Sequence, residues 1–209
     1  MIKRLYLPAL LGLAFIAYPV TVKAEDHSLR IRQIMASPVT LERALVAGKR
    51  AAFLCVHCHG ETGESVHANI PNLAGQNPVY LLTQIEKFGD GRRQDEFMSG
   101  LIRVLKPDDR INMAIYFAAQ SVVPAKVKDA ALVRMGGQIY SRLCTKCHGL
   151  QGYGERHIAR LAGQHPEYIT HSLERYRKGT KERSDPLMGS IARQLKDRIS
   201  PRWRASSRP

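Results

Sequence analysis

Two short segments of the chain contain residues whose types and spacing could attach a cofactor. Each has two cysteines separated by two residues and followed at once by a histidine: Cys55, Cys58 and His59 in the first segment, and Cys144, Cys147 and His148 in the second. This spacing is typical of c-type haem attachment, in which both thiols form thioether bonds with one porphyrin and the adjacent imidazole ligates the iron. The sequence therefore predicts two haem c groups, each containing iron and each covalently attached.

Other uses of two Cys-x-x-Cys pairs have to be weighed against haem attachment. Four cysteines could build one zinc site, form redox disulfides of the thioredoxin type, or hold a secreted domain together as a disulfide framework. None of these arrangements needs a histidine directly after the second cysteine in both segments. None of them explains the methionine that follows each segment either, so haem attachment is the leading hypothesis.

A methionine follows each segment at nearly the same distance and is the candidate for the second axial ligand. Met98 is the only methionine between the first motif and residue 107, and Met188 is the only one after the second motif. A thioether ligand raises the haem reduction potential relative to a second imidazole, which suits an electron carrier. Core packing is the alternative role, and we expect it of Met35, Met113 and Met135.

Several other histidines are rival iron ligands in principle: His57, His67, His157, His165 and His171. Their positions are scattered across the two copies of the repeat. We therefore expect surface or hydrogen-bonding roles for them.

The two motifs belong to an internal repeat. Cys55 and Cys144 are 89 residues apart, and Leu73-Ala74-Gly75-Gln76 recurs 88 residues later as Leu161-Ala162-Gly163-Gln164. Such self-similarity indicates one domain that has been duplicated. We predict a first domain over residues 25–121, a linker over 122–128 and a second domain over 129–209. Domains of this size bury little apolar surface, and a covalently attached haem would supply the missing core.

Helical patterns surround the motifs and alternating strand patterns are scarce, so the predicted fold is all-α. We expect helices over 40–54 with Thr40 as a cap, over 80–88 and over 168–176, and one that begins at Pro107. Gly48 and Gly137 interrupt the helical runs before the two motifs. A helix glycine costs about 1 kcal/mol relative to alanine, so we expect another helix to pack closely against these positions.

The chain begins with a segment that reads as a targeting signal. Ile2-Lys3-Arg4 is basic, residues 5–17 are mostly apolar, and Val22-Lys23-Ala24 has small residues where a signal peptidase cleaves. We predict a cleavable signal peptide over residues 1–24 and export to the periplasm of a Gram-negative bacterium. An uncleaved membrane anchor is the alternative, because residues 5–22 could almost span a bilayer.

Positive charge is concentrated in the second half of the chain. Without the leader the chain has 29 basic and 18 acidic residues, a net charge of +11, and residues 122–209 hold 18 of the basic and 7 of the acidic ones. Solubility is one explanation. A second is a dipole that orients the molecule against an acidic partner protein or an anionic surface such as the membrane periphery. We expect no nucleic-acid partner.

These features together resemble the cytochrome c4 family, periplasmic dihaem cytochromes built from two fused class I cytochrome c domains. The resemblance covers residues 40 to 195 and rests on both haem motifs, the repeated Leu-Ala-Gly-Gln, the Tyr-containing helix after it and the late methionine. It implies thioether attachment at Cys55, Cys58, Cys144 and Cys147, proximal ligands His59 and His148, and distal ligands Met98 and Met188.

The resemblance also implies that the backbone at Pro71 accepts a hydrogen bond from the ring of His59. The second copy has Ala159 at this position. A carbonyl is still present there, but the turn should be less rigid without the proline ring.

Three functions are consistent with these residues. The first is a diffusible carrier that passes electrons in a respiratory chain from a quinol-cytochrome c reductase towards a terminal oxidase, as the resemblance implies. The second is the dihaem electron-accepting subunit of a periplasmic dehydrogenase, such as a sulfide-oxidising flavocytochrome. The third is an enzyme such as a dihaem peroxidase, which needs an open iron site and is disfavoured by two matched His/Met pairs. We therefore expect no catalytic residues.

The repeat fails after residue 196. At an offset of 90, Ile111 of the first copy matches Pro201 and Tyr116 matches Ser206, so the helix that closes the first domain has no counterpart in the pattern. We expect residues 197–209 to be largely disordered. A reading-frame change near the end of the gene is one explanation, and a tail that orders on a partner is another. In both cases the second domain should be the less stable one.

Overall fold

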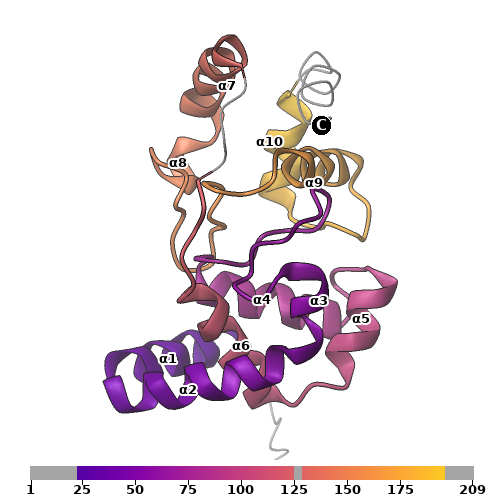
Figure 1. Ribbon diagram of the computed structural model, residues 1–209. Helices are drawn as coiled ribbons and strands as arrows, with labels where there is room; N and C mark the ends of the chain where they lie inside the picture. Colours follow the sequence, from indigo (N-terminus) through magenta and orange to yellow (C-terminus); the bar gives the residue numbers. More distant parts are fainter. Residues whose placement is uncertain (1–22, 125–128, 196–209) are drawn as a thin grey trace, which may run out of the picture.

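The computed structural model describes residues 23–124 and 129–195, and every regular element in these ranges is a helix. Figure 1 shows two groups of helices with long loops between them. The first unit contains α1 (Lys23–Ala36), α2 (Pro38–Ala51), the 3-10 turn η1 (Ala52–Leu54), α3 (Val56–His59), α4 (Pro78–Gly89), α5 (Glu96–Arg103) and α6 (Pro107–Ala118). The second unit contains α7 (Ala130–Leu143), α8 (Thr145–His148), α9 (Pro166–Lys178) and α10 (Pro186–Gln194).

The core of the first unit forms where α6 crosses α2. Gly48 makes this crossing possible, because a Cβ atom there would lie 2.2 Å from the carbonyl oxygen of Asn112 and 2.7 Å from Cβ of Tyr116. Ile111 and Ile115 of α6 are almost fully buried beside it. The expectation that another helix packs against Gly48 is confirmed.

The beginning of α2 differs from the prediction. The helix starts at Pro38, which suits the first helical position because its missing N–H would have no partner there, and Ser37 rather than Thr40 occupies the N-cap position. The Thr40 hydroxyl instead donates to the carbonyl of Ile34, 2.8 Å away, near the end of α1. Predicting Thr40 as the cap was therefore wrong. Its side chain joins the end of one helix to the start of the next.

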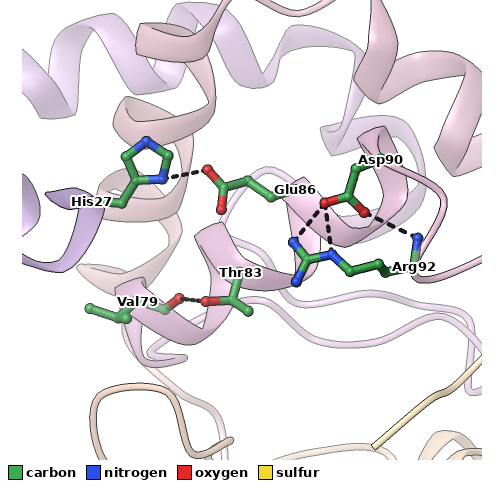
Figure 2. Close-up of polar contacts among 6 residues, drawn as sticks. All are labelled: His27, Val79, Thr83, Glu86, Asp90 and Arg92. Carbon is green, nitrogen blue, oxygen red and sulfur yellow. Dashed lines mark hydrogen bonds and ion pairs between the residues drawn. The ribbon is translucent and has the colours of Figure 1, made fainter. Parts of the chain in front are cut away.

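The helix α1 was not predicted, and it is attached to the first unit by apolar packing and by ion pairs to α4 and α6, the second of which joins Arg30 to Asp108 at 2.9 Å. Ile31 is 1% exposed and belongs to the core. Figure 2 shows the ring of His27 pointing at the carboxylate of Glu86 on α4, with Nδ1 and Oε1 2.6 Å apart. The same view shows Arg92 pairing with Asp90, the residue that follows α4. The proposed signal peptide lies almost wholly in residues 1–22, outside the described ranges.

The second unit has little apolar core of its own within the described ranges. Ala192 is its one buried apolar side chain there, and neither α7 nor α9 has a buried residue. A Cβ atom at Gly137 would meet no described atom within 4 Å, in contrast to Gly48. The expectation of close packing is therefore not met at Gly137. Residues 197–208, which align with α6 at the offset of 90, lie outside the described ranges. The disorder predicted for residues 197–209 therefore stays a prediction.

Val122, at the start of the predicted linker, sits between the two units. A Cβ atom at Gly75 would lie 2.3 Å from a methyl carbon of Val122, and one at Gly163 would lie 2.2 Å from the other methyl carbon. Both glycines also have positive φ angles, +58° and +82°, which favour glycine. The repeated Leu-Ala-Gly-Gln segments therefore meet each other around one linker side chain.

None of the described helices is long and apolar enough to cross a membrane.

Candidate haem sites

In the first unit, a short helix places the histidine of the motif in the interior. The motif begins at the end of η1 and continues through α3, and His59 is 7% exposed. Its Nδ1 atom lies 2.9 Å from the carbonyl oxygen of Pro71. A carbonyl can only accept, so Nδ1 carries the proton and Nε2 keeps its lone pair for a metal. Burial lowers the pKa of His59, which keeps the imidazole neutral and able to ligate.

The second unit repeats this arrangement. His148 is at the end of α8, is also 7% exposed, and has Nδ1 2.8 Å from the carbonyl oxygen of Ala159. The carbonyl expected at Ala159 therefore accepts the hydrogen bond without the proline ring that the first copy has at Pro71. Both histidines present the same ring nitrogen for coordination.

The two candidate methionines occupy equivalent helix positions. Met98 is the third residue of α5, and its N–H donates to Oδ1 of the N-cap residue Asp95 at 2.9 Å. Met188 is the third residue of α10, and its N–H donates to Oδ1 of Asp185 at the same distance. Both methionines are half-buried. Neither helix was predicted, although an aspartate three residues before each methionine is a typical N-cap signal.

The remaining methionines and histidines divide between core and surface. Met113 is 2% exposed in the first core, as expected, whereas Met35 and Met135 are 45% and 44% exposed, so the packing role predicted for these two was wrong. His57 is exposed and contacts the carbonyl of Phe53. The ring of His165 reaches the carbonyl of Ser65 in the other unit, at 2.9 Å. His67 and His157 are exposed and His171 is half-buried.

The other uses of four cysteines find no support in the described ranges. All four thiols are free, so no disulfide framework forms. No three His, Cys, Asp or Glu side chains of the described residues gather where a metal ion could bind, which leaves no shared zinc site. Burial raises the pKa of the thiols of Cys55 and Cys144, the opposite of what a thioredoxin-type redox cysteine needs.

A pair of arginines between the two units was missed by reasoning from the sequence. Arg93 and Arg183 stand 90 residues apart, the same offset as the two candidate methionines. Arg93 donates to the hydroxyl of Tyr168 in the second unit, and Arg183 donates to the hydroxyl of Tyr80 in the first, each at 3.2 Å. Arg183 also donates to Tyr168 and Tyr176. The matched offset was the signal that could have identified the pair.

No anion of the described residues balances this arginine pair. Arg183 is 3% exposed and its Nε has no partner, and no carboxylate of the described residues forms an ion pair with either arginine. Burial and the charge of Arg183 lower the pKa of Arg93. Burial alone would raise the pKa of Tyr168, but the charges of Arg183 and Arg93 outweigh it and lower this pKa to about 8. Buried cations need a paired anion.

The residues present therefore fit a haem in each unit. The thiols could attach a haem, and the buried neutral imidazole and the thioether could ligate its iron; each of these groups occurs in both units. Each haem carries two propionate carboxylates, and the arginine pair offers cationic donors of the kind that bind carboxylates in charge-assisted hydrogen bonds. A covalently attached haem would also add apolar surface to the thin core of the second unit.

Comparison with known proteins points in the same direction. The chain is 35% identical over 163 residues to cytochrome c4 of Pseudomonas aeruginosa, covering 73% of this chain and 81% of that protein. It is 31% identical over 158 residues to a thiosulfate dehydrogenase electron acceptor of Thiomonas intermedia, covering 68% and 72%. The crystal structure of reduced recombinant cytochrome c4 from Pseudomonas stutzeri superposes with a TM-score of 0.66 at 31% identity, covering 73% of this chain and 91% of that chain. No protein-family model matches.

Proposed function

The chain belongs to the cytochrome c4 family, and from this premise we propose that it is a periplasmic electron carrier rather than an enzyme. Its all-α fold of two class I cytochrome c domains and its two covalently attached haem groups follow from that membership. Each haem iron takes up and gives back one electron. The physiological route proposed here runs from a quinol-oxidising complex towards a terminal oxidase.

The residues of this chain divide the work of holding each haem. Cys55 and Cys58 attach one haem, and Cys144 and Cys147 attach the other. His59 and His148 are the proximal ligands, and Met98 and Met188 are the distal ligands. With a histidine and a methionine in the two axial positions, neither iron would have a place for a substrate.

One observation carries the proposal most directly. Each unit combines a buried histidine, whose Nδ1 is held by a backbone carbonyl, with a methionine at the third position of an aspartate-capped helix. Two matched sites of this kind suit transfer between partners, because rigid axial ligation limits the rearrangement that accompanies each change of iron charge. The signal peptide proposed over residues 1–24 accounts for the periplasmic location.

Haem content tests the proposal. The mature protein should exceed the mass of its polypeptide by two haem groups, and both should stay attached through acid-acetone extraction. Replacing Cys55 and Cys58 together by serine should leave a protein with one covalent haem. A wild-type mass with one haem or none contradicts the assignment, and retention of two covalent haems in the double variant removes the first cysteine pair from it.

The basic second half provides a test of partner docking. Five residues of α9 and the loop after it are basic, but Arg183 is buried, Arg175 pairs with Glu182 at 2.7 Å and Arg177 donates to the carbonyl of Ala192. Lys178 and Lys181 are exposed. We expect Lys178→Glu and Lys181→Glu to slow electron transfer with an acidic partner.

Raised ionic strength should slow the wild-type reaction in the same way, because exposed charges are screened over about 8 Å at physiological salt. Lys49→Glu, on the exposed part of α2, is the matched control and should change the rate little. Rates that respond neither to salt nor to the second-unit variants would leave the charge asymmetry as a solubility feature.

A second candidate function is that of a dedicated electron acceptor for one dehydrogenase. The relative from Thiomonas intermedia, named a thiosulfate dehydrogenase electron acceptor, favours this class over the flavocytochrome considered from the sequence. Reduction by thiosulfate with a purified thiosulfate dehydrogenase, compared with reduction by quinol with a cytochrome c reductase, distinguishes the two functions. Faster reduction in the first assay would assign the protein to the dehydrogenase.

A further inference from the structure

Two glutamines cross between the units and bind each other's backbone in the same way. Oε1 of Gln76 accepts from the N–H of Arg160 at 2.6 Å, and its Nε2 donates to the Arg160 carbonyl at 2.9 Å. Gln164 does the same with the N–H and carbonyl of Asn72, both at 2.9 Å. Gln76 and Asn72 are 6% and 7% exposed, so water does not readily replace these bonds.

The peptide groups that these glutamines hold are those that bind the proximal histidines. The Pro71–Asn72 peptide accepts from His59 at its carbonyl and donates to Gln164 at its N–H. The Ala159–Arg160 peptide accepts from His148 at its carbonyl and donates to Gln76 at its N–H. One peptide group therefore connects each histidine to the glutamine of the opposite unit.

Hydrogen bonds in such a chain strengthen one another. A peptide whose N–H donates to an acceptor carries more negative charge on its carbonyl oxygen, so the carbonyl becomes a better acceptor. A better acceptor draws the Nδ1 proton away from the histidine and raises the basicity of the ring as a metal ligand. A more basic axial ligand stabilises ferric over ferrous iron, which lowers the reduction potential.

We propose that Gln76 and Gln164 are positioning residues that set the reduction potential of the haem in the opposite unit. Gln76 acts through the Ala159–Arg160 peptide on the haem of the second unit, and Gln164 acts through the Pro71–Asn72 peptide on the haem of the first. The inference rests on the proposed ligation by His59 and His148. The inference implies that correct docking of the two units helps to determine the reduction potentials of both haems.

The test uses the full-length holoprotein with Gln76→Leu and Gln164→Leu. In Gln76→Leu the haem attached at Cys144 and Cys147 should gain potential while the other stays constant, and in Gln164→Leu the pattern should reverse. The equilibrium constant for electron exchange between the haems should thus change by up to about threefold, in opposite directions for the two variants, because the cooperative strengthening that is lost is a fraction of one hydrogen bond. Potentials are assigned to each haem by following its methyl resonances during a redox titration.

A second readout does not depend on the potentials. In the reduced protein, the Nδ1–H resonance of His148 should move in Gln76→Leu while that of His59 stays in place. The Arg160 amide should also lose protection against hydrogen exchange. Gln76→Met, which keeps the side chain unbranched, should give the same result and provides the test if the leucine variant folds poorly.

Asn77→Ala is the matched control. The Asn77 amide also crosses the interface, donating to the carbonyls of Tyr153 at 3.1 Å and Ile158 at 2.6 Å, but it does not touch the Ala159–Arg160 peptide. Its side chain caps nothing at the start of α4, so alanine removes only the cross-interface bonds. This variant should leave both potentials unchanged.

Three results would overturn the inference: equal shifts of both haems, a shift confined to the haem in the same unit as the variant, or an Asn77→Ala effect as large as that of Gln76→Leu. Failure of the underlying ligation is seen separately. It appears in the wild-type protein as a missing haem or as absent resonances from a histidine bound to iron.

Discussion

Replacing Met98 or Met188 by histidine is expected to lower the reduction potential of the haem in the same unit by about 0.2 V, a quarter of the range over which axial ligands set haem potentials. The physical reason is that a thioether favours ferrous iron, whereas a second imidazole is a stronger donor and favours ferric iron. Each variant should also lose the near-infrared charge-transfer band of one His/Met haem. Optical redox titration measures both effects.

The exposed methionines serve as controls for this experiment. Met35 and Met135 are 45% and 44% exposed, one in each unit, and their replacement by histidine should leave both potentials and the charge-transfer band unchanged. A potential that stays constant in Met98→His or Met188→His removes that methionine from the ligand set. A lower reduction potential of the second haem in Met135→His would indicate that Met135, and not Met188, is its distal ligand.

Replacing Gly48 by alanine is expected to destabilise the first unit by about 3 kcal/mol, at the upper end of the range for overpacked cores. The added Cβ would lie 2.2 Å from a backbone oxygen of Asn112 and 2.7 Å from Cβ of Tyr116, and neither atom is the flexible end of a side chain. The helices α2 and α6 would have to separate. Denaturant titration, followed through the His/Met band of each haem, measures the effect.

Gly137→Ala is the counterpart in the second unit and should behave in the opposite way. No described atom lies within 4 Å of the position of its Cβ, so alanine should gain up to about 1 kcal/mol from its higher helix propensity. A loss of stability as large as that of Gly48→Ala would show that another segment, such as residues 197–209, packs on this face.

In a denaturant titration of the unaltered protein we expect the Met188 ligand to be lost before the Met98 ligand, because the second unit buries less apolar surface within the described ranges.

Much of each candidate site could be predicted from the sequence because its chemistry depends on short spacings. Two cysteines and a histidine within five residues reach one porphyrin whatever surrounds them, so the motif specifies the cofactor locally. The matched offsets of the motifs and of Met98 and Met188 identified equivalent positions in two copies. Helical periodicity indicated an all-α fold, which agrees with the solved cytochrome c4 structure. Element boundaries were less accurate, as the start of α2 shows.

Only the tertiary structure decided how the two copies face each other. The repeat shows that Gln76 is equivalent to Gln164, and the same offset could have paired Arg93 with Arg183. Equivalence in sequence does not tell which groups each of these side chains hydrogen-bonds in the other unit. The bonds of Gln76 to Arg160 join residues 84 positions apart, and the pair of Arg183 with Tyr80 spans 103 positions. Such contacts depend on the docking of whole units. No local pattern of residues encodes them, because each side chain is satisfied only by a surface that the rest of the fold builds.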